Sequence, residues 1–118
     1  MIELYRGLII NVDLEPTKGS ETGKIRPCII VINNTYNQCV SVTKVVPLTE
    51  WTLKKSRIKT NVEVPPSETN GLSKLSIADC LQTRPIDHRN RLVSVRGELE
   101  SEILAQINQA LKVVFDLV

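Results

Sequence analysis

Arg26 is the residue of this 118-residue chain whose setting most directly suggests chemistry on an anion. It precedes Pro27, and a proline ring biases the residue before it to an extended conformation, so we expect the guanidinium at the mouth of a strand. A planar guanidinium binds a phosphate or a carboxylate through paired hydrogen bonds. Many strand-end arginines are instead solvated or ion-paired, and the residue alone does not choose between the two roles.

The segment 51–59 combines one aromatic ring with four cations and contains no acid. Its ring and cations are Trp51, Lys54, Lys55, Arg57 and Lys59. Aromatic rings stack on exposed bases, and Lys and Arg neutralise phosphates, so this composition suits a single-stranded nucleic acid. A solvated basic hairpin would have the same composition.

Two local patterns suggest phosphate or metal binding, and both are weak. The loop at 19–25, GSETGKI, has one residue too few between its glycines for a nucleotide-binding loop, and Ile25 stands where the Mg²⁺-binding hydroxyl belongs. Asp13 and Glu15 would share one face of a strand and could hold Mg²⁺, but a lone pair of carboxylates is a poor metal site. We therefore expect no metal and no cofactor.

Histidine and cysteine chemistry is also poorly supported. His88 is the only histidine and lies in a polar segment, 87–91, where a solvated turn is expected. One histidine supplies neither a two-histidine acid–base pair nor, with scattered cysteines, a zinc site. Cys28, Cys39 and Cys80 form no CxxC pair and no even set, so we expect buried, reduced thiols.

Composition and charge place the chain among ordinary globular domains. Apolar residues make up 42% and charged residues 24%, with four aromatic residues, so the core must be Val, Ile and Leu. Residues 1–59 hold nine Lys and Arg against five acids, and residues 60–118 hold six against eight. The net charge of +2 does not by itself indicate a nucleic-acid partner. A core this small favours dimerisation.

The chain begins without a recognisable targeting segment. Glu3 is followed by an apolar run of only Leu8, Ile9 and Ile10, too short for a signal peptide or a membrane span. Reduced cysteines are typical of cytoplasmic proteins. We expect a cytoplasmic protein that does not enter a membrane.

Short β-branched runs separated by turn residues predict strands through most of the chain. The expected strands are Leu8–Val12, Cys28–Asn33, Val40–Leu48, Thr60–Val64, Leu75–Cys80 and Leu92–Val95, with loops at Pro16–Gly23 and Pro65–Gly71. From Ser101, a plausible N-cap, apolar residues recur at helical spacing through Val114. This order predicts one domain over residues 1–118, a strongly bent antiparallel sheet or barrel with a C-terminal helix packed on it.

Five stretches spread over the chain closely resemble the MazF/PemK family of bacterial toxins. They are Arg6-Gly7, the run VDLEPTKGSETGKIRP at Val12–Pro27, Val31–Asn34, Gln82–Asp87, and Arg91-Leu92 with Arg96–Leu99 and the final helix. The resemblance implies a homodimeric SH3-like barrel of the CcdB/MazF/Kid type with a C-terminal helix. It also implies an mRNA interferase, an endoribonuclease that cuts single-stranded RNA at a short sequence without metal. A cognate MazE-like antitoxin with an extended acidic tail would hold it inactive.

The resemblance also assigns roles to individual residues. The catalytic arginine of the family's Lys/Gly-x-Arg-Pro motif falls on Arg26, and the catalytic threonine falls on Thr49. The RNA-contacting positions fall on Ser20, Glu21, Asn33 and Gln82. Arg84, in the same stretch as Gln82, and three members of the basic segment, Trp51, Lys55 and Arg57, complete the expected RNA surface. Several family members have an acid where this chain has Leu81, so the resemblance assigns no general base.

The residue chemistry agrees with these roles. Metal-independent RNA cleavage proceeds by attack of the neighbouring 2′-OH on phosphorus, so the protein must transfer protons and stabilise charge on the phosphoryl oxygens. Arg26 suits charge stabilisation and suits the role of base poorly, since a guanidinium stays protonated at pH 7. We expect Arg26 to bind the scissile phosphate and to protonate the 5′-oxygen, while Thr49 donates to a non-bridging oxygen.

Two other function classes share this fold. One is a binding toxin like the gyrase poison CcdB, which cuts nothing, and the other is a catalytically silent interaction subunit. The presence of both Arg26 and Thr49 favours a nuclease over either alternative.

Overall fold

A computed structural model describes residues 3–37 and 39–117 of the chain. The strands are β1 (Leu8–Asp13), β2 (Ile25–Ile30), β3 (Val42–Glu50), β4 (Asn61–Val64), β5 (Ser76–Asp79), β6 (Arg84–Asp87) and β7 (Leu92–Glu98). The helices are α1 (Asn34–Asn37), α2 (Leu53–Ser56), α3 (His88–Arg91) and α4 (Ser101–Val114), with a 3-10 turn, η1, at Cys80–Gln82.

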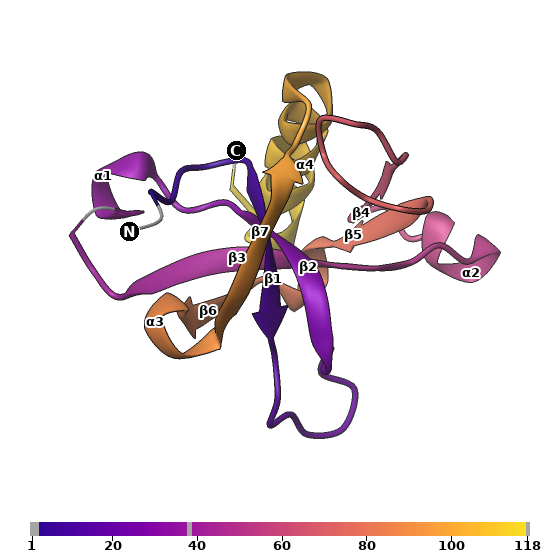
Figure 1. Ribbon diagram of the computed structural model, residues 1–118. Helices are drawn as coiled ribbons and strands as arrows, with labels where there is room; N and C mark the ends of the chain where they lie inside the picture. Colours follow the sequence, from indigo (N-terminus) through magenta and orange to yellow (C-terminus); the bar gives the residue numbers. More distant parts are fainter. Residues whose placement is uncertain (1–2, 38, 118) are drawn as a thin grey trace.

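The strands form one antiparallel sheet in the order β4-β5-β3-β2-β1-β7, and β6 pairs with β3 beside this path. In Figure 1, β1, β2 and β7 run across the direction of β3, so the sheet is strongly bent, and α4 lies at one side of it. The bent sheet with a C-terminal helix is the architecture that the sequence predicts. None of the helices in the described part of the chain is long and apolar enough to cross a membrane.

The core is aliphatic and lies on both faces of the bend. Neighbouring residues of β1 and β2 alternate between two clusters, as side chains on successive strand positions must. The cluster beneath α4 contains Ile9, Ile29, Val46, Leu48, Val62, Val64, Leu72, Ala78, Cys80, Leu99, Ile107 and Ala110. The opposite cluster contains Leu4, Leu8, Ile10, Val12, Leu14, Cys28, Ile30, Val45 and Ile86. Two buried faces explain why these strands are continuous apolar runs.

Several expected element boundaries are wrong. β2 starts at Ile25 rather than Cys28, so Arg26 lies inside the strand, opposite Val12 of β1. β6 was not expected, and it contains Pro85, which lacks the backbone N–H that a central strand needs. Within the described residues β6 pairs only with β3, so Pro85 does not interrupt hydrogen bonding to a second strand.

The helix α4 begins as expected but is not capped by Ser101. Its N-cap is Glu100, which makes no side-chain capping hydrogen bond. The Glu100 carboxylate instead accepts from Ser67 Oγ at 2.6 Å and from Asn70 Nδ2 at 3.1 Å. Asn70 is fully buried, and this contact ties the loop before β5 to the start of α4. A tertiary contact therefore replaces the local cap.

The polar segment 87–91 contains the short helix α3, in which the Asp87 side chain caps the backbone N–H of Arg89. His88 is half-buried, and its Nε2 lies 3.1 Å from the Val40 carbonyl oxygen, so this ring has a backbone partner. The expectation of a solvated histidine in a turn is wrong in this respect.

The three cysteines do not share one environment. Cys28 and Cys80 are buried free thiols, as expected, but Cys39 is exposed. Burial raises the pKa of Cys28 and of Cys80 to about 12, so both thiols stay protonated at neutral pH. Neither is suited to act as a nucleophile.

Candidate active site

The antiparallel register of β2 and β3 points to a close approach of Arg26 and Thr49. Cys28 lies opposite Pro47 in this ladder. Continuing the same register by two residues on each strand places Arg26 opposite Thr49, with both side chains on the face that carries Cys28. The charge of Arg26 also acts on the Cys28 thiol, where it offsets part of the rise in pKa that burial causes.

Arg26 is half-buried and anchored through one nitrogen. Its Nε donates a hydrogen bond of 3.3 Å to the carbonyl oxygen of Gly23. Gly23 ends the loop Pro16–Gly23 between β1 and β2, which we call the first loop. Within residues 3–37 and 39–117, no hydrogen bond to protein engages its two terminal nitrogens. These form the fork that binds an anion in paired fashion.

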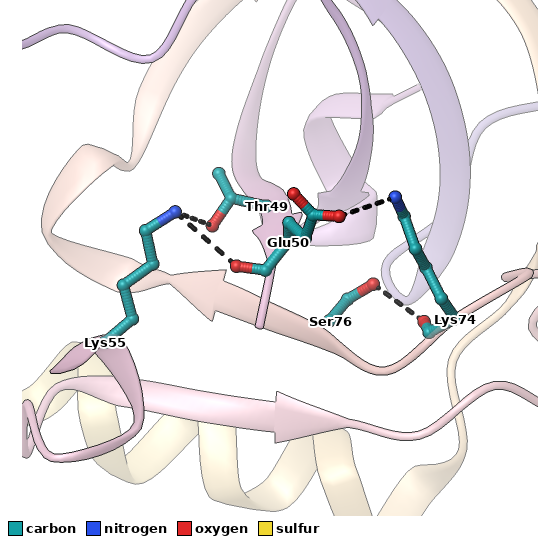
Figure 2. Close-up of polar contacts among 5 residues, drawn as sticks. All are labelled: Thr49, Glu50, Lys55, Lys74 and Ser76. Atoms are coloured by element: carbon teal, nitrogen blue, oxygen red, sulfur yellow. Dashed lines mark hydrogen bonds and ion pairs between the residues drawn. The ribbon is translucent and has the colours of Figure 1, made fainter. Parts of the chain in front are cut away.

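Thr49 is 8% exposed, at the start of a chain of polar contacts shown in Figure 2. Lys55 Nζ lies 3.4 Å from Thr49 Oγ1 and 3.5 Å from the carbonyl oxygen of Glu50. The Glu50 carboxylate turns to the other side, where it forms a 2.9 Å ion pair with Lys74. This pair lowers the pKa of Glu50, first through the hydrogen bond from Lys74 and then through its charge.

The Glu15 carboxylate forms hydrogen bonds across the first loop, so it is not free to bind a metal. Its carboxylate accepts from the Lys24 backbone N–H at 2.7 Å and from Thr17 Oγ1 at 3.1 Å, and these bonds lower its pKa. Gly23 makes room for this contact, because a Cβ there would lie 2.4 Å from Glu15 Oε2. Asp13 accepts from the Glu15 backbone N–H at 3.0 Å. Asp13 and Glu15, the suggested Mg²⁺ ligands, therefore both form hydrogen bonds that hold the loop.

Gln82 connects this loop to the end of β5. Its Nε2 donates to the Ser20 carbonyl oxygen at 3.1 Å, and its Oε1 accepts from the Thr22 N–H at 3.2 Å. Arg84 donates from Nη1 to the Leu14 carbonyl oxygen at 3.2 Å. A groove beside this contact is lined by Glu21, Leu81, Gln82, Thr83, Arg84 and Pro85. Four of the expected RNA-binding residues, Ser20, Glu21, Gln82 and Arg84, thus meet in one region.

Gln82 reaches the loop because η1 interrupts the edge beside β3. Leu48 pairs with Ala78 of β5, and Val45 pairs with Arg84 of β6. Two residues of β3 lie between these two positions, while five residues lie between Ala78 and Arg84. The three extra residues leave the strand pairing with β3 and form η1, as in a large β-bulge.

The basic segment is not a hairpin. Residues 53–56 form the helix α2, and the side chains of the segment diverge. Trp51 donates from Nε1 to Glu63 Oε1 at 2.8 Å, Lys55 turns toward Thr49, and Arg57 is exposed. The composition of this segment does not reveal that one of its lysines faces the candidate catalytic threonine.

Asn33 does not join the other expected residues within one chain. It follows the end of β2 while Arg26 lies near its start, and seven residues of extended chain span about 20 Å. Its side chain accepts from the Thr35 backbone N–H at 2.9 Å.

Sequence reasoning missed Asp79, Glu50 and Lys74. Asp79 is the half-buried last residue of β5, opposite Asn61 of β4. Burial raises its pKa, and the backbone N–H groups of Gln82 and Leu81 and the charge of Lys55 partly offset that rise. An acid inside an otherwise apolar strand was the available signal for Asp79. Glu50 and Lys74 lie far apart in the chain, and no local pattern pairs them.

Comparisons with known proteins identify the family of the chain. The family model described as "PemK-like, MazF-like toxin of type II toxin-antitoxin system" matches residues 5–115. The endoribonuclease MazF of Staphylococcus saprophyticus is 34% identical over 114 residues, which cover 97% of this chain and 92% of the relative. The endoribonuclease EndoA of Bacillus subtilis is 29% identical over 113 residues, covering 96% and 95%.

Solved structures show the same fold. MazF of Deinococcus radiodurans superposes with a TM-score of 0.83 at 20% identity, covering 99% of this chain and all of the other. A mycobacterial endoribonuclease in complex with its cognate antitoxin superposes with a TM-score of 0.74 at 23% identity, covering 100% and 98%. The resemblance seen in the sequence and its predicted fold are therefore confirmed. The chain belongs to the PemK-like, MazF-like toxin family of type II toxin–antitoxin systems.

Proposed function

We propose that this toxin is an endoribonuclease that cleaves single-stranded RNA by attack of the 2′-OH on the neighbouring phosphorus, without a metal ion. The observation that supports this most directly is the β2–β3 register, which sets Arg26 opposite Thr49 when it is continued two residues past its last pair, Cys28 and Pro47. The endoribonuclease relatives match nearly the whole chain, which supports the same reaction.

In this reaction the 2′-oxygen bonds to phosphorus as the bond to the 5′-oxygen breaks. The 2′-OH loses its proton and the departing 5′-oxygen gains one, which leaves a 2′,3′-cyclic phosphate and a 5′-OH. Arg26 binds the phosphate through its terminal nitrogens and donates a proton or hydrogen bond to the leaving oxygen. Thr49 donates to a non-bridging oxygen, where negative charge builds up in the transition state.

The RNA strand would lie along the groove beside the first loop. Ser20, Glu21, Gln82 and Arg84 meet there, and the cations of the segment 51–59 extend the surface past Thr49. Trp51 and Arg57 would contact bases or phosphates on that side, and Asn33 would contact nucleotides farther along the strand. Phosphate contacts of this kind weaken as salt is added.

The toxin would act as a homodimer in the cytoplasm, held inactive by a cognate MazE-like antitoxin. Apolar side chains exposed on β7 and at the end of α4 support the dimer; they are Val93, Val95, Val113, Phe115 and Leu117. A mycobacterial structural neighbour is an endoribonuclease in complex with its cognate antitoxin, which supports an antitoxin partner here. The extended acidic tail of that partner is an expectation from the family resemblance. Free cysteines and an RNA substrate favour the cytoplasm.

A binding toxin of the same fold, like the gyrase poison CcdB, is the alternative. The experiment that separates them incubates the purified protein with a long unstructured RNA in excess EDTA and maps the ends. We expect 5′-OH ends and 2′,3′-cyclic or 3′-phosphate ends. Intact RNA, or cleavage that requires Mg²⁺, would contradict the proposal.

The Arg26 variants test the site itself. Arg26→Ala should lower the single-turnover rate at least about 100-fold, or roughly 2.7 kcal/mol of transition-state stabilisation, and change RNA affinity much less. Arg26→Lys keeps the charge but loses the fork, so it should stay severely impaired. Affinity is measured on RNA with a 2′-deoxy residue at the cut site, which does not react. A near-normal rate for Arg26→Ala in folded protein would refute the assignment.

A further inference from the structure

The backbone of Lys55 is held on both sides of the residue. Its N–H donates to Oγ1 of Thr52, the N-cap of α2, at 3.1 Å. Its carbonyl oxygen accepts from Asn61 Nδ2, at the start of β4, at 3.0 Å. Although α2 is a short helix, these two bonds determine the direction in which the Lys55 side chain leaves it.

That direction is toward Thr49. Lys55 is half-buried, whereas the neighbouring Lys54 is exposed. In Figure 2 the ammonium group of Lys55 points back to the end of β3, with Thr49 Oγ1 at 3.4 Å and the Glu50 carbonyl oxygen at 3.5 Å. The side chain is therefore turned toward the candidate catalytic hydroxyl rather than extended into solvent.

The surrounding charges keep Lys55 in this position. A free Glu50 carboxylate next to Thr49 would attract the ammonium group, but Lys74 holds that carboxylate in a 2.9 Å ion pair. Lys55 consequently reaches the backbone carbonyl of Glu50 and not its side chain. On the other side, Asp79 lies close enough for its carboxyl to respond to the charge of Lys55.

The hydrogen bond has a chemical consequence for Thr49. An ammonium group donates and never accepts, and a threonine hydroxyl has one proton and two lone pairs. When Thr49 Oγ1 accepts from Lys55, its own proton must point away from that bond. The hydroxyl is then oriented as a donor, which is the role that a phosphoryl oxygen requires.

We propose that Lys55 is a positioning residue that orients the Thr49 hydroxyl as a hydrogen-bond donor toward the scissile phosphate. The proposal rests on the endoribonuclease function proposed above. It differs from the expectation that Lys55 binds RNA directly, because it assigns the effect of Lys55 to Thr49.

A double-mutant cycle between Lys55 and Thr49 tests this proposal. Lys55→Met keeps the length of the side chain and removes the donor, Lys55→Arg keeps a donor, and Thr49→Val removes the hydroxyl. Lys112→Met, on the exposed face of α4, is the control for loss of one positive charge. Each variant is measured for single-turnover cleavage, affinity for the 2′-deoxy RNA and melting temperature.

We expect Lys55→Met to slow cleavage about tenfold, which is the loss of one oriented hydrogen bond, with affinity changed less than about threefold. Lys55→Arg should recover most of the rate, and Lys112→Met should cut like the wild type. In the Thr49→Val background, Lys55→Met should have no further effect, since the group that it orients is absent.

Four outcomes would overturn the proposal. If Lys55→Met slows Thr49→Val by the same factor as the wild type, Lys55 acts independently of Thr49. If Lys55→Met weakens affinity as much as rate, it is an RNA contact. If Arg26→Ala and Thr49→Val are inactive while Lys55→Met cuts normally, this inference fails and the proposed function stands. Normal cleavage by Thr49→Val would refute both.

Discussion

Gln82 and Thr22, sixty residues apart in the chain, are joined by a 3.2 Å hydrogen bond from the Thr22 backbone N–H to Gln82 Oε1. The same side chain donates to the Ser20 carbonyl oxygen at 3.1 Å. One amide group thus satisfies a donor and an acceptor of a loop that has no apolar anchor. Gln82 is therefore a strap that holds the first loop against η1.

Removing this strap should loosen the loop. Gln82→Ala should speed backbone amide exchange at Ser20–Thr22 while exchange in β1 and β2 stays slow, because those strands do not depend on it. RNA affinity should fall with it, since Ser20 and Glu21 lose their fixed position. Hydrogen-exchange mass spectrometry and binding to 2′-deoxy RNA measure the two effects.

Gln106→Ala, on the exposed face of α4, is the matched control and should change neither measurement. Unchanged exchange at Ser20–Thr22 in Gln82→Ala would show that the loop is held by other contacts, such as those of Glu15.

Substitutions at Thr49 should show whether cleavage depends on its hydroxyl or on its methyl group. Thr49→Ser should keep much more activity than Thr49→Val, because the expected role is a hydrogen bond to the phosphate and valine has the shape without the hydroxyl. Single-turnover cleavage checks the order. Equal rates for the serine and valine variants would contradict a role for the hydroxyl.

Gly97 should be far less tolerant of alanine than Gly19. A Cβ at Gly97 would lie 2.5 Å from the Thr69 carbonyl oxygen and 2.6 Å from Asn70, both backbone contacts. Gly97→Ala should therefore lower the free energy of unfolding by about 3 kcal/mol. Gly19 has a φ of +56° and nothing within 4 Å of its Cβ position, so Gly19→Ala should cost about 1 kcal/mol of backbone strain.

Urea unfolding of the two glycine variants and the wild type gives both differences. Equal costs would mean that the backbone around Gly97 moves aside, which the buried contacts of Asn70 with Glu100 argue against.

Asp79→Asn should stabilise the protein at neutral pH. Burial raises the pKa of Asp79, so folding disfavours its charged form. For an acid shifted upward, the stabilising contribution is present below the unfolded pKa and is lost as pH rises through the folded pKa. The difference in unfolding free energy between Asp79→Asn and wild type should therefore be largest above that pKa and shrink on acidification.

Thermal or urea unfolding from pH 3 to pH 8 checks this trend. A variant that is less stable than the wild type at pH 7 would show instead that the N–H groups of Gln82 and Leu81 and the charge of Lys55 stabilise the Asp79 carboxylate by more than its burial costs.

Elements with a local pattern could be predicted from the amino-acid sequence. The strand at β1 was correctly predicted from a short apolar run, and the helix from Ser101 to Val114 was correctly predicted because burial of one helix face imposes a period on the residues. The aliphatic core followed from composition. The family resemblance assigns catalytic roles to Arg26 and Thr49, and these roles stay predictions; the β2–β3 register, continued by two residues, sets the two opposite one another.

The tertiary structure alone decided which polar groups meet. The strap from Gln82, the contact between Lys55 and Thr49, the ion pair of Glu50 with Lys74 and the binding of Glu100 to Asn70 join residues with no shared periodicity. Their partners depend on strand register, on the three residues that η1 adds beside β3, and on the turn of α2. Such contacts form only when folding brings distant residues together, so neither the periodicity nor the composition of the sequence predicts them.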